Sequence, residues 1–339
     1  MTNFSELTTL HVGGPAKNVI RAKTEAELIE AVRMADGSGS ELLIVGGGSN
    51  LLVGDLGFDG TVIIVETTGN SYEIDACSGG MLQVSAGVNW DEFVAFTIEK
   101  NLANLESLSG IPGTVGGAPI QNIGAYGHEV AEAIARVRTY DRKSRTIKTF
   151  TNDQCEFGYR DSIFKRETAQ YLILDVTFHL RLGEFSLPIK YKELADFLKV
   201  DLDARVPTSE LRLAVLALRE KKGMLIRGVH QNWSAGSFFV NPIISAEVAA
   251  TLPESAPRWP QPDGLIKTSA AWLMENAGVS KGEKLNGAKI SDNHVLALTN
   301  AGNATAEDIV QLARSARRKV QEKFGITLIP EVRLVGIDF

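Results

Sequence analysis

Cysteine is scarce in this chain, whose 339 residues include only Cys77 and Cys155. Two thiols are too few for a disulfide framework, and their spacing matches no metal-ligand motif. We therefore expect no metal site, and we interpret both residues as structural thiols in a reducing cytoplasm.

An excess of positive charge is also lacking, because the formal net charge is −6. Binding to nucleic acid or to a membrane surface would need a basic face, so neither partner is expected. No window approaches eighteen uninterrupted apolar residues, and the first ten residues lack the basic and apolar regions of a signal peptide. We expect a cytoplasmic protein, and a monomer, since no apolar repeat calls for an oligomer.

Glycine, by contrast, is concentrated in one stretch. Residues 110–127 read GIPGTVGGAPIQNIGAYG, with six glycines, two prolines and no charged side chain. Such a segment can be buried while its backbone bends freely, and buried backbone without regular pairing needs other hydrogen-bond partners. A large polar ligand such as a dinucleotide could supply them. A tight cluster of turns that packs two sheets explains the pattern equally well.

A second glycine turn, GGGSN at 46–50, follows a predicted buried strand at 42–45. It lacks the Lys and Ser or Thr that end a Walker A motif, and no helix follows it as the dinucleotide fingerprint requires. The turn is either a nest of amides suited to a pyrophosphate or a plain glycine turn.

Capping residues in the sequence predict the ends of several helices. Thr24 and Glu27 form a predicted capping box for a helix that we expect Gly37 to end, and further helices are expected over 91–100, 209–221 and 269–277. The clearest helix spans 305–324, with its own capping box and Gly325 as its C-terminal cap. A strand is expected over 326–335, although Pro330 within it removes a ladder donor.

Three polar side chains stand in settings that leave their roles open. Arg160, beside Asp161, is either part of a surface ion pair or a functional cation. Ser237, between a glycine and two aromatics, is either a satisfied core hydroxyl or a proton donor. Glu331 is either the ion-pair partner of Arg333 or a catalytic acid.

Six segments, taken in this order, resemble the UDP-N-acetylenolpyruvoylglucosamine reductases over nearly the whole chain: GGGSNLL, GIPGTVGGAPIQNIGAYG, YRDSIFK, SAGSFFVNP, AAWLMENAG and IPEVRLVG. Tyr191 in PIKYKEL matches a tyrosine on the extra loop of the longer subclass of that family. The resemblance implies an α+β, three-domain FAD-binding fold of the vanillyl-alcohol-oxidase type with a C-terminal substrate-binding domain. The expected divisions are 1–66, 67–215 and 216–325, with a terminal strand at 326–339 that returns to the FAD domain.

The resemblance also implies the reaction and its residues. NADPH would reduce noncovalently bound FAD, and the hydride would pass to the enolpyruvyl double bond of a UDP-sugar in peptidoglycan precursor synthesis. Three residues are implied to be catalytic: Arg160, Ser237 and Glu331. Those implied to hold FAD are Gly47, Gly48, Ser49, Asn50, Gly113, Gly117, Ile123 and Gly124. Those implied to hold the substrate are Tyr126, Tyr191, Lys222, Asn241 and His294.

Two departures from the family pattern qualify these assignments. The run between Lys222 and Ser237 is longer than in most relatives, so Lys221 could take the place of Lys222. The position of His294 is often glutamine in relatives.

Glu331 would repel developing negative charge as a carboxylate, so we expect it either to be protonated through burial or to orient a donor. An oxidase and a catalytically silent binder remain alternatives, against which intact Ser237 and Glu331 argue.

Overall fold

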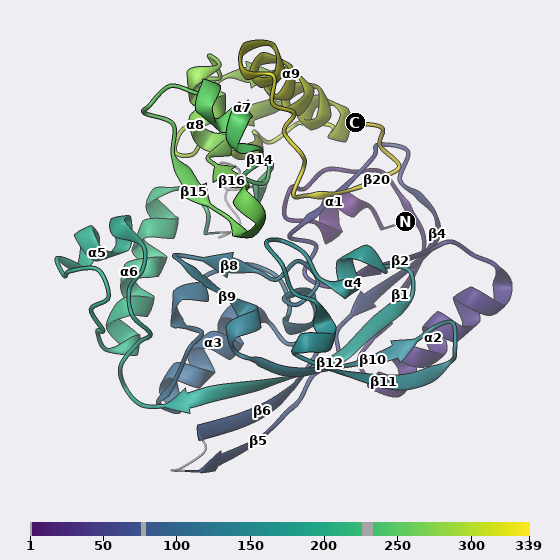
Figure 1. The fold of residues 1–339 in the computed structure, drawn as a ribbon. Coiled ribbons are helices and arrows are strands. Elements are labelled where there is room, and N and C mark those ends of the chain that lie inside the picture. Colours follow the sequence, from purple (N-terminus) through teal and green to yellow (C-terminus); the bar gives the residue numbers. More distant parts are fainter. Residues whose placement is uncertain (1, 76–78, 226–232) are drawn as a thin grey trace. The chain divides into compact units, whose positions relative to one another are not determined.

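The computed structural model describes residues 2–75, 79–225 and 233–339, and it divides into two compact units (Figure 1). Unit 1 comprises Met1–Ala16, Gly48–Phe58 and Lys221–Phe339, and unit 2 comprises Lys17–Gly47 and Asp59–Glu220. The division passes through the GGGSN turn. The expected boundaries after residues 66, 215 and 325 stay a prediction, and Cys77 lies outside the described residues.

The described part of unit 2 contains two main sheets and a two-stranded antiparallel ribbon of β8 (Gly124–Ala125) and β9 (His128–Glu129). The smaller main sheet has the order β1-β4-β2, and β2 runs parallel to β4 with Leu42 opposite Thr61. The larger is antiparallel, with the order β11-β10-β12-β6-β5 and with β7 pairing β12. The strands are β1 (Ala16–Ala22), β2 (Leu42–Val45), β4 (Phe58–Val65), β5 (Asn70–Asp75), β6 (Gly79–Ser85), β7 (Leu102–Ala103), β10 (Ile134–Asp141), β11 (Thr146–Thr151) and β12 (Tyr171–Leu182).

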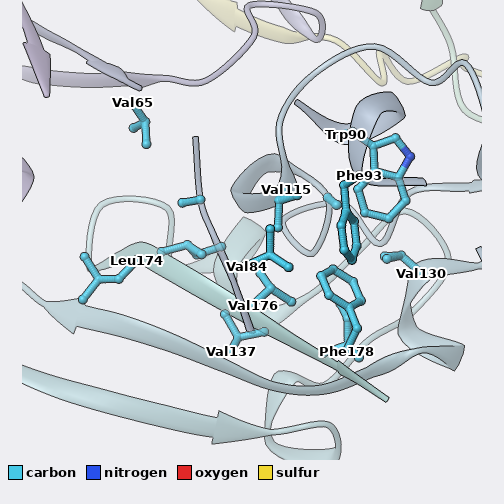
Figure 2. Packing of buried hydrophobic residues seen from close by; sticks show 14 of the residues in the cluster. Val65, Val84, Trp90, Phe93, Val115, Val130, Val137, Leu174, Val176 and Phe178 are labelled. Carbon is cyan, nitrogen blue, oxygen red and sulfur yellow. The ribbon is translucent and has the colours of Figure 1, made fainter. Parts of the chain in front are cut away.

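The larger core of unit 2 packs helix α3 (Trp90–Glu99) against the antiparallel sheet. Phe93 on the helix and Phe178 on β12 have ring centroids 4.9 Å apart, with Trp90 beside them (Figure 2). Val115, from the glycine stretch, is fully buried in the same cluster. Burying one apolar side chain contributes roughly 1.5–3 kcal/mol, so Val115 anchors the stretch to the sheet.

A smaller core in unit 2 lies between helices α5 (Lys192–Leu198) and α6 (Thr208–Lys221). Its buried residues include Ile189, Leu194 and Leu211, and Tyr126 packs against them. The end of the glycine stretch is thus tied to the segment that carries Tyr191. The other helices of unit 2 are α2 (Glu25–Ser38) and α4 (Ile163–Arg166).

Unit 1 is built around helix α9 (Ala306–Phe324), which packs beside α8 (Ala270–Asn276) in Figure 1. Ile309, Leu312 and Val320 on α9 are buried in its core. The sheets have the orders β13-β19-β18-β17 and β14-β16-β15, and β3 pairs β20 in parallel. The remaining elements are α1 (Phe4–Leu7), β3 (Leu51–Val53), β13 (Ser234–Ser237), β14 (Ile243–Ile244), α7 (Ala246–Thr251), β15 (Arg258–Pro260), β16 (Ile266–Thr268), β17 (Lys284–Leu285), β18 (Ala288–Ile290), β19 (Ala297–Asn300) and β20 (Arg333–Val335).

The capping boxes were predicted correctly, and two boundaries were not. Thr24 and Thr305 both accept the N3 amide with the reciprocal side-chain bond present. Helix α2 runs through Gly37, because Gly39 at φ 69° supplies the left-handed cap. The strand expected over 326–335 is confined to β20, since Pro330 has no amide hydrogen and makes only an isolated bridge with Phe239.

Candidate active site

Glycine is required where two backbone segments of unit 2 meet. A Cβ on Gly47 would lie 2.7 Å from the Cα of Gly113, and a Cβ on Gly46 would lie 2.5 Å from the Oγ1 of Thr114. Gly113 also has φ +121°, where other residues are strained. Glycine at 46 and 47 therefore lets the two turns meet backbone to backbone. The FAD contacts expected of Gly47 and Gly113 stay a prediction.

The stretch also satisfies part of its own backbone. Val115 donates to the Val88 carbonyl at 2.9 Å, Gly116 to the Ala86 carbonyl at 2.8 Å, and Gly117 to the Thr114 carbonyl at 2.9 Å. The turn-cluster interpretation is thus correct for 115–117. These bonds show how the stretch is held at its centre.

In unit 1, the rest of the GGGSN turn is tied to the segment that carries Glu331. Gly48 has φ +61°, and a Cβ there would lie 1.9 Å from the Leu7 carbonyl oxygen. The Nδ2 of Asn50 donates to the Glu331 carbonyl at 3.2 Å, and the amide of Arg333 donates to the Asn50 carbonyl at 3.1 Å. An expected cofactor residue and an expected catalytic residue are therefore in direct contact.

Arg160 is held against the glycine stretch. Its Nη2 donates to the Gly124 carbonyl at 2.7 Å, and its Nη1 reaches the Asn122 carbonyl at 3.4 Å. The neighbouring Asp161 forms an ion pair with Arg166. Asp161 thus has another cation as its ion-pair partner, and the Arg160 guanidinium is oriented by the same loop that carries Ile123 and Gly124.

Asn122 fixes this loop, a role that was not predicted from the sequence. It is buried with φ +44°, and its Nδ2 donates to Glu129 Oε2 at 2.7 Å and to the Gly158 carbonyl at 3.0 Å. In the sequence Asn122 stands between Gln121 and Ile123, and asparagine adopts the left-handed conformation found here more readily than most residues.

Tyr126 and Tyr191 lie together in unit 2, as the resemblance implied for the substrate pocket. Their rings form an edge-to-face pair with centroids 5.6 Å apart. Burial raises the pKa of Tyr126 to about 12, against the opposing effect of the Arg219 cation. The phenol is therefore a neutral hydrogen-bond donor at neutral pH.

Arg219, near the end of α6, holds the start of the glycine stretch. Its side chain is buried, and its Nε donates to the Gly110 carbonyl at 3.0 Å. Desolvation lowers the pKa of Arg219, while Tyr126 and Asp91 oppose that shift. Arg219 thus holds the first residue of the glycine stretch.

Asp91 holds the same residue from the other side. Its Oδ1 accepts the Gly110 amide at 2.6 Å, and its two carboxylate oxygens accept from the Arg212 guanidinium at 2.6 and 2.9 Å. Gly110 is therefore fixed through both its amide and its carbonyl. We call Asp91, Gly110, Arg212 and Arg219 the Gly110 clasp.

In unit 1, Ser237 lies at the end of β13 with its backbone opposite Ala297 of β19. The Ser237 Oγ is 3.5 Å from the Nε2 of His294. The structure thus brings one expected catalytic residue and one expected substrate residue together.

Glu331 is joined to the strand of Ser237 through backbone bonds. Its amide donates to the Phe238 carbonyl at 2.7 Å, and the Val240 amide donates to the Ile329 carbonyl at 3.1 Å. Glu331 is partly buried, so full exposure, which would have ruled out a protonated carboxyl, is not observed.

Asn241 and Lys222 complete the expected residues of unit 1. The Oδ1 of Asn241 accepts the Ala270 amide at 2.9 Å, at the start of α8. Lys222 is partly buried, whereas Lys221 at the end of α6 is exposed.

Two further features bear on the kind of protein. Among the described residues, none of the helices combines the length and apolar composition needed to cross a bilayer. In the same ranges, no group of three or more His, Cys, Asp or Glu side chains is arranged to hold a metal ion.

Comparison with known proteins defines the class first. Residues 16–149 match the family model of an FAD-binding domain, and this range contains both glycine turns. The α+β architecture, the glycine-lined backbone and this match identify a FAD-dependent oxidoreductase of the fold expected from the sequence.

The particular family follows from the rest of the chain. Residues 229–335 match the C-terminal domain of UDP-N-acetylenolpyruvoylglucosamine reductase. The enzyme of that name from Cutibacterium acnes is 52% identical over 98% of this chain and 89% of its own, and that from Streptomyces avermitilis is 46% identical over 99% and 94%. The crystal structure of the reductase (MurB) from Thermus caldophilus covers 98% of this chain and 97% of its own, with 25% identity and a TM-score of 0.68. This chain belongs to the UDP-N-acetylenolpyruvoylglucosamine reductase family, and the expected family and FAD-binding fold are confirmed.

Proposed function

We propose that this protein reduces UDP-N-acetylglucosamine enolpyruvate to UDP-N-acetylmuramate with NADPH, through noncovalently bound FAD, in peptidoglycan precursor synthesis. When bound, FAD accepts a hydride from NADPH and supplies it to the outer carbon of the enolpyruvyl double bond. The observation that carries the proposal is the backbone pairing of the Ser237 strand with the Glu331 segment, which joins a proton donor and a carboxylate in one unit.

FAD is held by backbone that only glycine allows and by the polar residues next to it. Gly47 and Gly113, which meet backbone to backbone, would lie against the pyrophosphate, and Gly48, Ser49 and Asn50 continue the first of these turns. Gly117 contributes from the glycine stretch, and Ile123 and Gly124 contribute from the loop whose carbonyls orient Arg160.

The catalytic residues stabilise the negative charge that forms on the substrate and deliver one proton to it. Hydride addition leaves negative charge on the carbon beside the substrate carboxylate, and Arg160, already oriented by the Gly124 carbonyl, stabilises that charge. Ser237 then protonates the carbon; general acids typically contribute about 10²- to 10⁴-fold. Glu331 is either a neutral carboxylic acid or the group that orients a donor.

The substrate's diphosphate and sugar are held by Tyr126, Tyr191, Lys222, Asn241 and His294. The neutral phenol of Tyr126 donates to an oxygen of the substrate, and Lys222 is preferred over exposed Lys221 because it is partly buried. We further propose a cytoplasmic monomer without nucleic-acid or membrane partners, and the domain division 1–66, 67–215, 216–325 and 326–339.

An anaerobic titration tests this function. The purified protein should be yellow, NADPH should bleach it, and UDP-N-acetylglucosamine enolpyruvate should restore the colour with one product per flavin. If the reduced protein instead stayed colourless with this substrate, while an alcohol or sugar reduced the flavin and dioxygen reoxidised it, the result would point to an oxidase.

A further inference from the structure

His294 is placed beside Ser237 by the backbone rather than by chance contact. Ser237 pairs with Ala297 across β13 and β19, and the Ala297 amide donates to the His294 carbonyl at 3.0 Å. The Ser291 amide in turn donates to the Ala297 carbonyl at 2.8 Å, which closes the turn. The imidazole is thus held at the entrance of the strand that pairs with Ser237.

In the part of the chain that the structure describes, His294 is the side chain within hydrogen-bonding distance of the Ser237 hydroxyl, at 3.5 Å from Nε2 to Oγ. This distance is long, and contacts between catalytic groups often shorten when substrate binds. Asp292, the charged neighbour on the same turn, forms an ion pair with Lys289 of β18. Strand β13 contributes no charged side chain, and Glu331 lies on the segment at its other edge.

The chemistry of the proposed function creates a need that this contact meets. When Ser237 protonates the substrate carbon, its O–H bond breaks as the new C–H bond forms, and the hydroxyl becomes an alkoxide. A serine alkoxide is too basic to persist, so a proton must reach Oγ during or directly after that step. Imidazolium is the side chain best suited to supply it near neutral pH.

We propose that His294 is the proton donor that restores the Ser237 hydroxyl in each turnover. The Nε2–H bond of the imidazolium breaks as the Oγ–H bond forms, which leaves neutral imidazole, and solvent then returns the proton to the ring. No electrons are transferred in this step. The role rests on the proposed function and adds to it, because substrate binding alone does not require the contact with Ser237.

The test compares His294→Ala and His294→Gln with Asn293→Ala, a control on the same turn at an exposed side chain. Flavin reduction by NADPH should stay within about twofold of wild type in all three variants. Reoxidation by saturating substrate should fall at least tenfold in both His294 variants and should be unchanged in Asn293→Ala. Glutamine can donate a hydrogen bond but cannot release the proton, so His294→Gln should not recover the rate.

Imidazole added to the buffer gives the discriminating readout. It should accelerate reoxidation in His294→Ala and have no effect in Ser237→Ala, which has no hydroxyl to reprotonate. A second readout needs no turnover: in ¹⁵N NMR of the FAD-loaded protein, Ser237→Ala should shift the Nε2 signal of His294, and Asn293→Ala should not.

The outcomes distinguish the proposed reprotonation of Ser237 by His294, here called the relay, from the proposed function on which it rests. A higher substrate Kd with an unchanged saturating rate would show that His294 only binds substrate, and absence of imidazole rescue would also overturn the relay. Failure of the wild-type protein to be reoxidised by the substrate would instead overturn the proposed function, and the relay with it.

Discussion

The Gly110 clasp gives the sharpest prediction about how the flavin-binding stretch is held. Asp91→Asn keeps the shape of the side chain but removes the charge that binds Arg212 and the Gly110 amide. Hydrogen bonds to charged groups contribute about 1.5–3 kcal/mol each. The side chains of Asp91 and Arg212 are 34% and 18% exposed, which reduces the ion pair toward the roughly 0–1 kcal/mol of surface pairs. Because the amide oxygen can keep one bond, we expect a loss of about 2 kcal/mol.

Hydrogen exchange measures this loss at the bond concerned. A local stability loss of about 2 kcal/mol should make the Gly110 amide exchange roughly 30-fold faster, if it opens locally. Glu92→Gln is the matched control, because it removes an exposed carboxylate from the same turn of α3. Equal exchange in Asp91→Asn and wild type would refute the view that Asp91 fixes the start of the stretch.

The same variant predicts a pH dependence. Desolvation acts to raise the pKa of Asp91, but Arg212 and the Gly110 amide together outweigh it, so the pKa lies below its ordinary value of 3.8. A lowered carboxyl pKa stabilises the fold above the unfolded-state value, and that stability is lost as pH falls through the folded-state value. The difference in unfolding free energy between wild type and Asp91→Asn should therefore be at its full value at pH 7 and should shrink below about pH 4.

Three further predictions concern single positions. Gly113→Ala should sharply weaken FAD binding, since φ +121° strains alanine; retained flavin at wild-type affinity, by fluorescence titration, would contradict this. Thr305→Ala should lower the urea unfolding stability by about 1 kcal/mol through loss of the α9 cap, and Thr305→Ser should recover most of it. Gly37→Ala should raise stability by roughly 0.5–1 kcal/mol, because the site is helical with no atom within 4 Å of the new methyl group; a loss would show strain there.

Local signals predicted local structure. The α9 boundaries were read correctly because the Thr305 capping box and Gly325 act within a few residues. The end of α2 was misread because a glycine inside a helix and a glycine that ends one look alike in sequence. The strand near Pro330 was overextended because the pattern of apolar residues does not reveal which edge has a partner.

The proposed site residues were assigned from motifs, whereas the residues that hold them in position were not predicted. Arg160 and Ser237 stand in recognisable segments, whereas Asp91 and Arg219 act through partners far along the chain: Arg212 is 121 residues from Asp91, and Gly110 is 109 residues from Arg219. Asn122 likewise contacts the Gly158 carbonyl, 36 residues away. Such contacts are set by tertiary packing, which the pattern along one segment does not encode.

The account depends most on Ser237 as the proton donor, and stopped-flow measurement of the two half-reactions of Ser237→Ala tests this most directly. We predict that NADPH reduces the flavin at nearly the wild-type rate, while reoxidation by UDP-N-acetylglucosamine enolpyruvate slows by about 10²- to 10⁴-fold. Equal slowing of both halves, or reoxidation at the wild-type rate, would contradict the account.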